Sequence, residues 1–243
     1  MVLFWRTDLR KVLHSGKIAD EKMYGSCGRL SFPRRDFDLL HGLAKGGIFM
    51  FDKDFWKSSF EKMRSTRWLA VMAVFLGLRI VVSRFSIPVS ANLNISLSFF
   101  LVALEGMLFG PAAGMIFAFT EDILEFLLFP SGYGFFFGYT LSAMLGVLTY
   151  ALFMYRQRIT VAKIIGAKLI SSYAINVLLG SYWTYLLVGS KSYLAYAAVS
   201  FYKNTILLPI QIIGIVLIVN LLLPFFRKKK YITTGQKAPI PFF

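Results

Sequence analysis

The chain has 243 residues, of which 57% are hydrophobic and 16% are charged. Soluble domains are typically about 45–50% apolar and about 25% charged, so this composition favours a membrane protein. The net charge of +15 does not indicate nucleic-acid binding, because the basic residues gather at the two ends and in one mid-chain loop, as the positive-inside rule requires. Such basic ends also suit contact with anionic membrane lipid. The single cysteine, Cys27, excludes an intramolecular disulfide.

Residues 1–49 differ from the rest in carrying charges of both signs, scattered glycines and few long apolar runs. Met50 opens a sequence that makes sense as a start of its own, so we expect residues 1–49 to be a disordered extension or a non-native leader. A genuine cytoplasmic tail fits their composition equally well. We expect residues 50–66 to form a cytoplasmic segment, 67–227 a membrane domain and 228–243 a basic cytoplasmic tail.

Apolar runs near the length that a bilayer requires predict an all-α integral membrane bundle of about six transmembrane helices. The predicted spans are 67–87, 93–109, 112–129, 136–155, 164–188 and 203–226. The loops around 88–92, 130–135 and 189–202 carry little positive charge, whereas the opposite ends of the spans are basic. The positive-inside rule therefore predicts a multi-pass protein of the cell membrane with both termini in the cytoplasm.

Ionisable residues interrupt these spans. Counting about 1.5 Å per residue places Arg79 and Asp122 at about the same depth, where they could pair or share a polar ligand. Glu121 and Glu125 share one helix face, from which Asp122 is rotated by about 100°. Glu105 is expected near the inner end of its span, within reach of water. Because charge in hydrocarbon is costly, these residues predict a functional site inside the protein, with simple hydrogen bonding between helices as the alternative.

Polar and aromatic residues are expected to gather on the outward side of the bundle. The candidate ligand-binding residues are Arg79, Arg84, Asp122, Phe135, Tyr139, Thr140, Ser142, Lys203, Asn204 and Gln211. Carboxylates pair with amino-heterocycles, Lys and Arg pair with carboxylates, and aromatic rings stack on flat ligands. The set predicts a site for a ligand that has both a donor-rich ring and acidic groups. A turn-forming loop is expected to close over it. The loop consists of Pro130, Ser131, Gly132, Tyr133 and Gly134.

Motifs for catalysis and nucleotide hydrolysis are missing from the sequence. His14 and His41 both precede the first predicted span, which excludes a histidine base or a His-ligated metal within the membrane. There is no P-loop, no His-Glu-x-x-His and no Gly-x-Ser-x-Gly. We therefore expect no enzymatic activity, no metal and no cofactor. A membrane enzyme acting on a lipid or prenyl substrate is the alternative, and a self-sufficient secondary transporter is disfavoured because no internal repeat is visible.

Small residues form a stripe on the first predicted helix. Ala70, Ala73 and Gly77 lie at i, i+3 and i+7, so they share one face. Small residues let helix backbones approach closely in lipid. The stripe predicts either docking of a partner membrane protein or packing within this bundle.

Four stretches form a distinctive combination of motifs. They are LRIVVSRFSIP (78–88), MLFGPAAG (107–114), EFLLFPSGYGFFFGYTLSA (125–143) and YKNTILLPIQ (202–211). Together they resemble the folate-specific substrate-binding subunits of energy-coupling factor (ECF) transporters. The resemblance extends from about Thr66 to about Arg227. It implies a six-helix membrane bundle that binds folate from outside and associates with a transmembrane coupling protein and two cytoplasmic ATPase subunits.

The resemblance also assigns roles to individual residues. It implies that Asp122 contacts the amino edge of the pterin ring and that the loop of residues 129–137 acts as the gate. It implies that polar or glutamate parts of the ligand are held by Arg79, Arg84, Lys203 and Asn204. The stripe of small residues corresponds to the family's alanine-rich docking motif. A binding subunit for another vitamin is the remaining alternative within this class.

Overall fold

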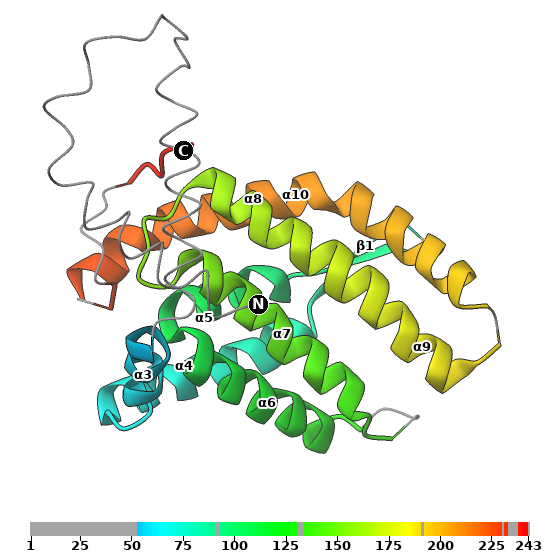
Figure 1. The fold of residues 1–243 in the computed structure, drawn as a ribbon, viewed down its shortest axis with the longest axis horizontal. Coiled ribbons are helices and arrows are strands. Elements are labelled where there is room, and N and C mark those ends of the chain that lie inside the picture. Colours follow the sequence, from blue (N-terminus) through cyan, green and yellow to red (C-terminus); the bar gives the residue numbers. More distant parts are fainter. Residues whose placement is uncertain are drawn as a thin grey trace, which may run out of the picture. The chain divides into compact units, whose positions relative to one another are not determined.

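The described part of the chain is a bundle of helices with one short hairpin (Figure 1). The computed structural model describes residues 53–90, 93–130, 134–190, 192–229, 231–232 and 238–242. The predicted extension of residues 1–49 lies outside the described residues, as do Ser131, Gly132 and Tyr133. The elements are α3 (Lys53–Lys62), α4 (Thr66–Ser83), β1 (Ser86–Ser90), β2 (Leu93–Ser96), α5 (Ser98–Phe109), α6 (Pro111–Leu128), α7 (Phe137–Met154), α8 (Val161–Ile170), η1 (Ser171–Leu179), α9 (Gly180–Val188) and α10 (Tyr193–Lys228).

The predicted third and fourth spans agree closely with α6 and α7, which pack against each other. Pro111 occupies the first turn of α6, where its missing N–H costs nothing and its fixed φ suits a helix. Gly110 makes the turn before it with a φ of 82°, a conformation that residues with a Cβ rarely adopt. The Gly-Pro pair therefore sets the sharp reversal between α5 and α6.

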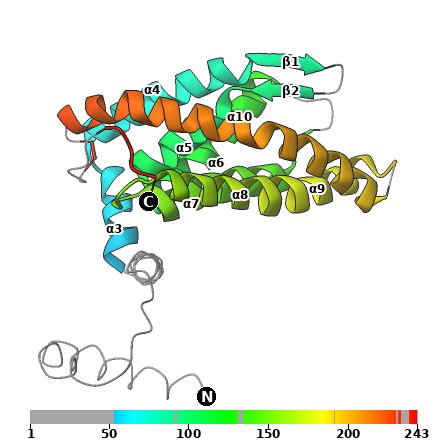
Figure 2. The ribbon, with the colours of Figure 1, turned by 90° about the horizontal axis from the view of Figure 1, so that it is seen from above.

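The predicted boundary between the first two spans is wrong. α4 ends at Ser83 and α5 begins at Ser98, because β1 and β2 form an antiparallel hairpin between them. Figure 2 shows this hairpin continuing from the end of α4. A bulge follows Pro88, which has no N–H to donate to a neighbouring strand.

The fifth and sixth predicted spans are longer and less regular than expected. α8, η1 and α9 form one continuous helical run with a π-helical middle. α10 begins at Tyr193, so the loop predicted for residues 189–202 is wrong for most of its length. Ser192 caps this early start, because its side chain accepts a hydrogen bond from the backbone N–H of Ala195 at 3.4 Å. Such a cap satisfies one of the free N–H groups at a helix start.

α5 is the centre of the bundle. It contacts α4, α6, α7 and α10, and all of its residues from Ala103 to Phe109 are buried. Gly106 lets α7 approach closely, since a Cβ at this position would lie 2.7–2.8 Å from atoms of Tyr150, Val147 and Ala151. A larger residue would force α5 and α7 apart, and close-packed interiors tolerate such changes poorly.

α3 packs against the turn between α5 and α6 and is hydrogen-bonded to both helices. The hydroxyl of Ser59 donates to the carbonyl of Phe109 at 2.8 Å and accepts from the N–H of Ala113 at 3.0 Å. Phe55 packs edge-on against Tyr155, with ring centroids 5.3 Å apart. One serine thus satisfies a free carbonyl at the end of α5 and a free N–H at the start of α6. The sequence predicted only a cytoplasmic segment here.

Lys62, at the end of α3, gives the fold a pH dependence. Its ammonium donates to the carbonyl of Leu108 and lies 4.3 Å from the ring centroids of both Trp68 and Tyr155. Burial, assisted by the charge of Arg156, lowers the pKa of Lys62 from 10.5 to about 7. Above pH 7 the unfolded chain therefore binds more protons at this residue than the folded chain does, so stability rises with pH.

We expect the melting temperature of the detergent-solubilised protein to rise from about pH 7 to about pH 9.5, below the pH at which tyrosines ionise. Lys62→Met should flatten this rise, because methionine keeps the packing and removes the proton. Thermal unfolding at several pH values measures both slopes. Equal slopes in the two proteins would contradict the assignment.

The described part of the C-terminal tail packs against the bundle. The N–H groups of Val161 and Ala162 donate to the carbonyls of Pro241 and Phe242 at 3.0 and 3.1 Å. The N–H of Ile240 donates to Asn220 Oδ1 at 2.8 Å. These contacts satisfy free N–H groups at the start of α8.

Four helical segments of the described chain are long and apolar enough to cross a membrane: Thr66–Ser83, Phe137–Met154, Val161–Val188 and Tyr193–Lys228. α6 has 18 residues as well, but three of them are acidic, and α5 has only 12 residues. Large apolar side chains are exposed on these helices, for example Leu217 and Leu221 of α10. Such surfaces are expected where helices face lipid.

Candidate functional site

A cavity of about 190 Å³ lies among α4, α5, α7 and the α8–η1 run. Two cations, Arg79 and Lys168, line it together with several hydroxyl and amide groups, and none of the described lining residues is acidic. Of the predicted ligand-binding residues, Arg79 and Ser142 line this cavity. The full lining is Arg79, Phe99, Val102, Ser142, Ala143, Gly146, Tyr150, Lys168, Ser171, Ile175 and Asn176.

The π-helical segment η1 supplies one wall of the cavity. Ser171, Ile175 and Asn176 all line it, and Lys168 joins them from the last turn of α8. In a π-helix the hydrogen bonds run from i to i+5, so residues four and five apart come onto one face. π-helical turns inside α-helices are frequent at functional sites. This irregular segment therefore explains how so many residues of one helix reach the same cavity.

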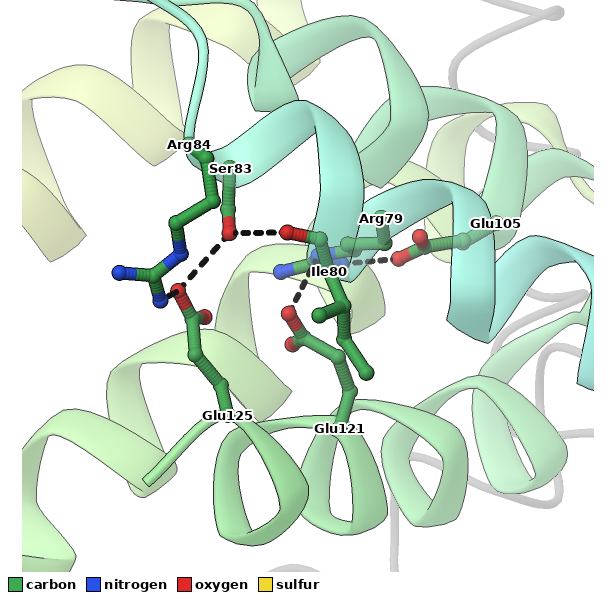
Figure 3. Close-up of polar contacts among 7 residues, drawn as sticks. All are labelled: Arg79, Ile80, Ser83, Arg84, Glu105, Glu121 and Glu125. Carbon is green, nitrogen blue, oxygen red and sulfur yellow. Dashed lines mark hydrogen bonds and ion pairs between the residues drawn. The ribbon is translucent and has the colours of Figure 1, made fainter. Parts of the chain in front are cut away.

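Arg79 forms a buried ion cluster with two glutamates from other helices (Figure 3). Its Nη1 donates to Glu105 of α5, and its Nε lies 3.1 Å from Oε1 of Glu121 on α6. The exposed fractions are 7% for Arg79, 0% for Glu105 and 2% for Glu121. The expectation that Glu105 reaches water is therefore wrong. Ionisable groups buried this deeply are costly to keep out of water, and here the guanidinium and the two carboxyl groups compensate by facing one another.

A second, more exposed ion pair lies nearer the end of α4. Arg84 Nη2 lies 2.6 Å from Oε1 of Glu125, and the hydroxyl of Ser83 donates to the same oxygen at 2.9 Å (Figure 3). The guanidinium of Arg84 also lies over the ring of Phe129, 3.9 Å from its centroid. The predicted residue Arg84 thus links α4 to α6 near the predicted lid.

Asp122 lies on a different face of α6 from Glu121. Its Oδ2 accepts a hydrogen bond from the hydroxyl of Thr140 at 2.6 Å. The two predicted residues Asp122 and Thr140 are therefore brought together, but neither lines the cavity. The pairing of Arg79 with Asp122 that the sequence allowed is not found, because Arg79 pairs with Glu105 and Glu121.

An aromatic group borders the cavity at Ser142. The indole N–H of Trp183 donates to the Ser142 hydroxyl at 3.0 Å. Phe136 packs edge-on against Trp183, with centroids 5.6 Å apart, and against Tyr139 at 5.8 Å. The predicted residue Phe135 packs instead against Phe126. Neither of the predicted aromatic residues Phe135 and Tyr139 lines the cavity, whereas Trp183, which was not among the predicted binding residues, contacts a residue that does.

The predicted residues of α10 lie outside the cavity lining. Of these residues, Asn204 contacts a residue of the cavity lining: its Oδ1 accepts a hydrogen bond from Asn176 at 3.4 Å. Lys203 and Gln211 are half-buried, and Oε1 of Gln211 has no hydrogen-bond partner among the described residues. Pro130 and Gly134, the described residues of the predicted lid, are both exposed.

The small-residue stripe of α4 faces outward. Ala70, Ala73 and Gly77 are exposed, and a Cβ added at Gly77 would meet nothing within 4 Å. Packing of the stripe within this bundle is therefore excluded for the described residues. An open stripe of small residues suits the close approach of another helix in lipid.

Several cavity residues went unrecognised in the sequence. These include Lys168, Tyr150 and Asn176, which belong to apolar runs. Lys168 and Asn176 are recognisable in the sequence as polar residues within a predicted span, a feature that indicates a functional site. Tyr150 resembles any aromatic residue of a helix core. The π-helical turn that brings Asn176 and Ser171 to one wall leaves no recognisable pattern in the sequence.

Comparison with known proteins agrees with this architecture. Residues 67–228 match the family described as "ECF transporter, substrate-specific component". The match spans well over half of the chain and includes α4 to α10 and all of the cavity lining. The chain therefore belongs to the substrate-specific components of ECF transporters.

Similar proteins carry a more specific description. The chain is 31% identical over 153 residues to "Folate transporter FolT" of Clostridium novyi (strain NT), covering 63% of this chain and 88% of that protein. It is 28% identical over 157 residues to "Folate transporter FolT" of Leuconostoc mesenteroides subsp. mesenteroides, covering 60% and 81%. A solved structure described as "Crystal structure of FolT bound with folic acid" has a TM-score of 0.55 and 34% identity, covering 61% of this chain and 89% of that chain.

Proposed function

We propose that this chain is the membrane-embedded folate-binding subunit of an ECF-type vitamin uptake transporter. The observation that carries the proposal is its similarity in fold and sequence to a FolT structure bound with folic acid. The cavity among α4, α5, α7 and η1 is the binding site in this proposal. The chain binds folate on the outer side of the membrane and catalyses no reaction.

The chemistry of the cavity suits part of a folate molecule. Folate combines a pterin ring, a benzoyl group and a glutamate with two carboxylates. Arg79 and Lys168 supply positive charge, and Phe99 and Tyr150 supply aromatic surface for a flat ring. Pockets for drug-sized ligands usually have about 300–1,000 Å³, so a cavity of about 190 Å³ would enclose one end of the ligand. The rest would extend toward Asn204 and the aromatic group around Trp183.

The distribution of basic residues supports an orientation in the membrane. The start of α4 lies beside the end of α10, because Arg67 donates to the carbonyl of Lys229. The start of α8 lies beside the same part of α10, because Val161 donates to the tail residue Pro241 and the neighbouring Ile240 donates to Asn220 of α10. Arg156 and Arg158 belong to the same end. We infer that this end faces the cytoplasm, with six spans and both termini inside. The hairpin and the predicted lid then face outward.

Uptake requires partners that supply energy. The chain would associate with a transmembrane coupling protein and two cytoplasmic ATPase subunits, as other substrate-specific components of ECF transporters do. The exposed stripe of Ala70, Ala73 and Gly77 on α4 is the docking surface in this proposal.

We expect purified protein to bind folate, with a change in tryptophan fluorescence on titration. Trp183 is positioned to report binding because it donates a hydrogen bond to the cavity residue Ser142. Trp183→Phe should remove most of the fluorescence change and serves as the control for its origin. Thiamine and riboflavin, titrated in parallel, test for another vitamin. Binding of either of these in place of folate would contradict the proposal.

A further inference from the structure

Lys168 is a buried cation for which the fold itself supplies no counterion. It is 3% exposed and lines the cavity from the last turn of α8. Its ammonium lies 5.9 Å from the ring centroid of Phe99. No carboxylate or hydrogen-bond acceptor contacts it among the residues that the structure describes. A buried ammonium is strongly unfavourable unless it is paired and hydrogen-bonded.

Tyr150, another residue that lines this cavity, carries a second unsatisfied donor. It is 1% exposed, and its hydroxyl has no hydrogen-bond partner among the described residues. It lies on α7, which packs directly against α8. Buried hydroxyl groups nearly always have a partner, and an orphan one calls for an explanation. Two residues of one small cavity therefore carry donor groups without a described acceptor.

The remaining charge around the cavity does not neutralise Lys168. Arg79 is the other cation of the lining, and its two described carboxylate partners, Glu105 and Glu121, are not lining residues. The surface that the described residues present to a ligand is therefore rich in donors. Such a surface favours an acceptor, above all an oxygen with negative charge.

We propose that Lys168 and Tyr150 form a donor subsite that binds an acceptor oxygen of the ligand, an inference that rests on the proposed folate-binding function. Folate offers such an oxygen in three places: the ring carbonyl of the pterin, the carbonyl of the benzoyl amide and the carboxylates of the glutamate. The bound oxygen completes the hydrogen bonding of both side chains. The ammonium of Lys168 and the hydroxyl of Tyr150 thus contribute to ligand affinity, whereas the ring of Tyr150 packs in the hydrophobic core of the bundle.

Two variants separate this role from a structural one. Lys168→Met removes the charge at similar volume, and Tyr150→Phe removes only the hydroxyl. Because neither group has a described partner in the apo protein, we expect the melting temperature without ligand to stay the same or to rise. Lys163→Met is the matched control, since the Lys163 ammonium binds Gln157 and the Arg158 carbonyl in the α7–α8 loop.

Folate titration measures the effect on binding. We expect Lys168→Met to weaken folate affinity by at least about tenfold and Tyr150→Phe by about threefold to tenfold, the ranges for charged and neutral hydrogen bonds. Lys163→Met should bind like the wild type. Equal affinities in wild type and Lys168→Met would overturn the subsite and leave the proposed function intact. A wild-type protein that binds no folate would overturn both.

Two fragments, used as competitors of folate, identify the source of the oxygen. 6-Methylpterin carries the ring carbonyl and no carboxylate, whereas 4-aminobenzoylglutamate carries the carboxylates and no pterin. If Lys168→Met weakens only the first, the subsite binds the pterin, and if it weakens only the second, it binds the benzoylglutamate part of folate. An unchanged affinity for both fragments would contradict the subsite.

Discussion

Replacing Arg79 by methionine is expected to lower the free energy of unfolding by about 3–5 kcal/mol, because two buried glutamates would lose their cation. Arg79 joins α4 to Glu105 of α5 and Glu121 of α6. These contacts hold one wall of the cavity against the centre of the bundle. We therefore expect folate binding to be lost together with stability, as measured by thermal unfolding and folate titration of the same preparation.

The matched control is the second ion pair of the same helices. Arg84→Met breaks the contact with Glu125, but the Arg84 side chain is 44% exposed, so we expect a loss of no more than about 1 kcal/mol. A triple variant, Arg79→Met with Glu105→Leu and Glu121→Leu, should recover much of the lost stability, since apolar replacement of a buried ion cluster is often neutral or stabilising. Similar melting temperatures for Arg79→Met and Arg84→Met would contradict the cluster's structural role.

The second large effect is expected from Ala73→Trp, which should leave folate binding intact and abolish folate uptake. Ala73 is exposed on α4 in line with Ala70 and Gly77, so an indole there disturbs no described contact within the chain. It would, however, keep a partner helix from approaching the stripe closely. Binding is measured on the purified protein. Uptake is measured as folate accumulation in cells that also produce the coupling protein and the ATPases.

Leu217→Trp on α10 controls for the added bulk in the membrane. Leu217 is an exposed apolar residue on a different helix, and we expect both binding and uptake to survive its replacement. Normal uptake by Ala73→Trp would show that α4 is not the docking surface. Loss of binding in Ala73→Trp would show that the substitution acts on the bundle itself.

The sequence identified the ionisable residues within the predicted spans, but it did not predict which of them pair with each other. Counting residues placed Arg79 and Asp122 at one depth, and the structure instead pairs Arg79 with Glu121. The reason is rotation: consecutive helix residues point about 100° apart, so Glu121 faces α4 while Asp122 faces Thr140 of α7. Depth follows from counting along one helix, whereas the direction that a side chain faces depends on how several helices pack.

Other features could not be predicted from local patterns. The hairpin of β1 and β2 replaces the expected ends of two spans, because its strands stabilise each other and neither run signals this alone. The π-helical turn η1 brings Ser171 and Asn176 to one wall without a sequence signature. By contrast, the Gly110-Pro111 turn and the spans that became α6 and α7 follow from local chemistry, and their prediction is confirmed.

The central claim is that folate binds in the cavity between α4, α5, α7 and η1. A crystal structure of the chain with folate tests it most directly. We expect one end of the ligand to contact Lys168, Tyr150 and Arg79, with the other end extending toward Trp183 and Asn204. Folate bound elsewhere on the bundle, with no contact to Lys168 or Arg79, would contradict the account.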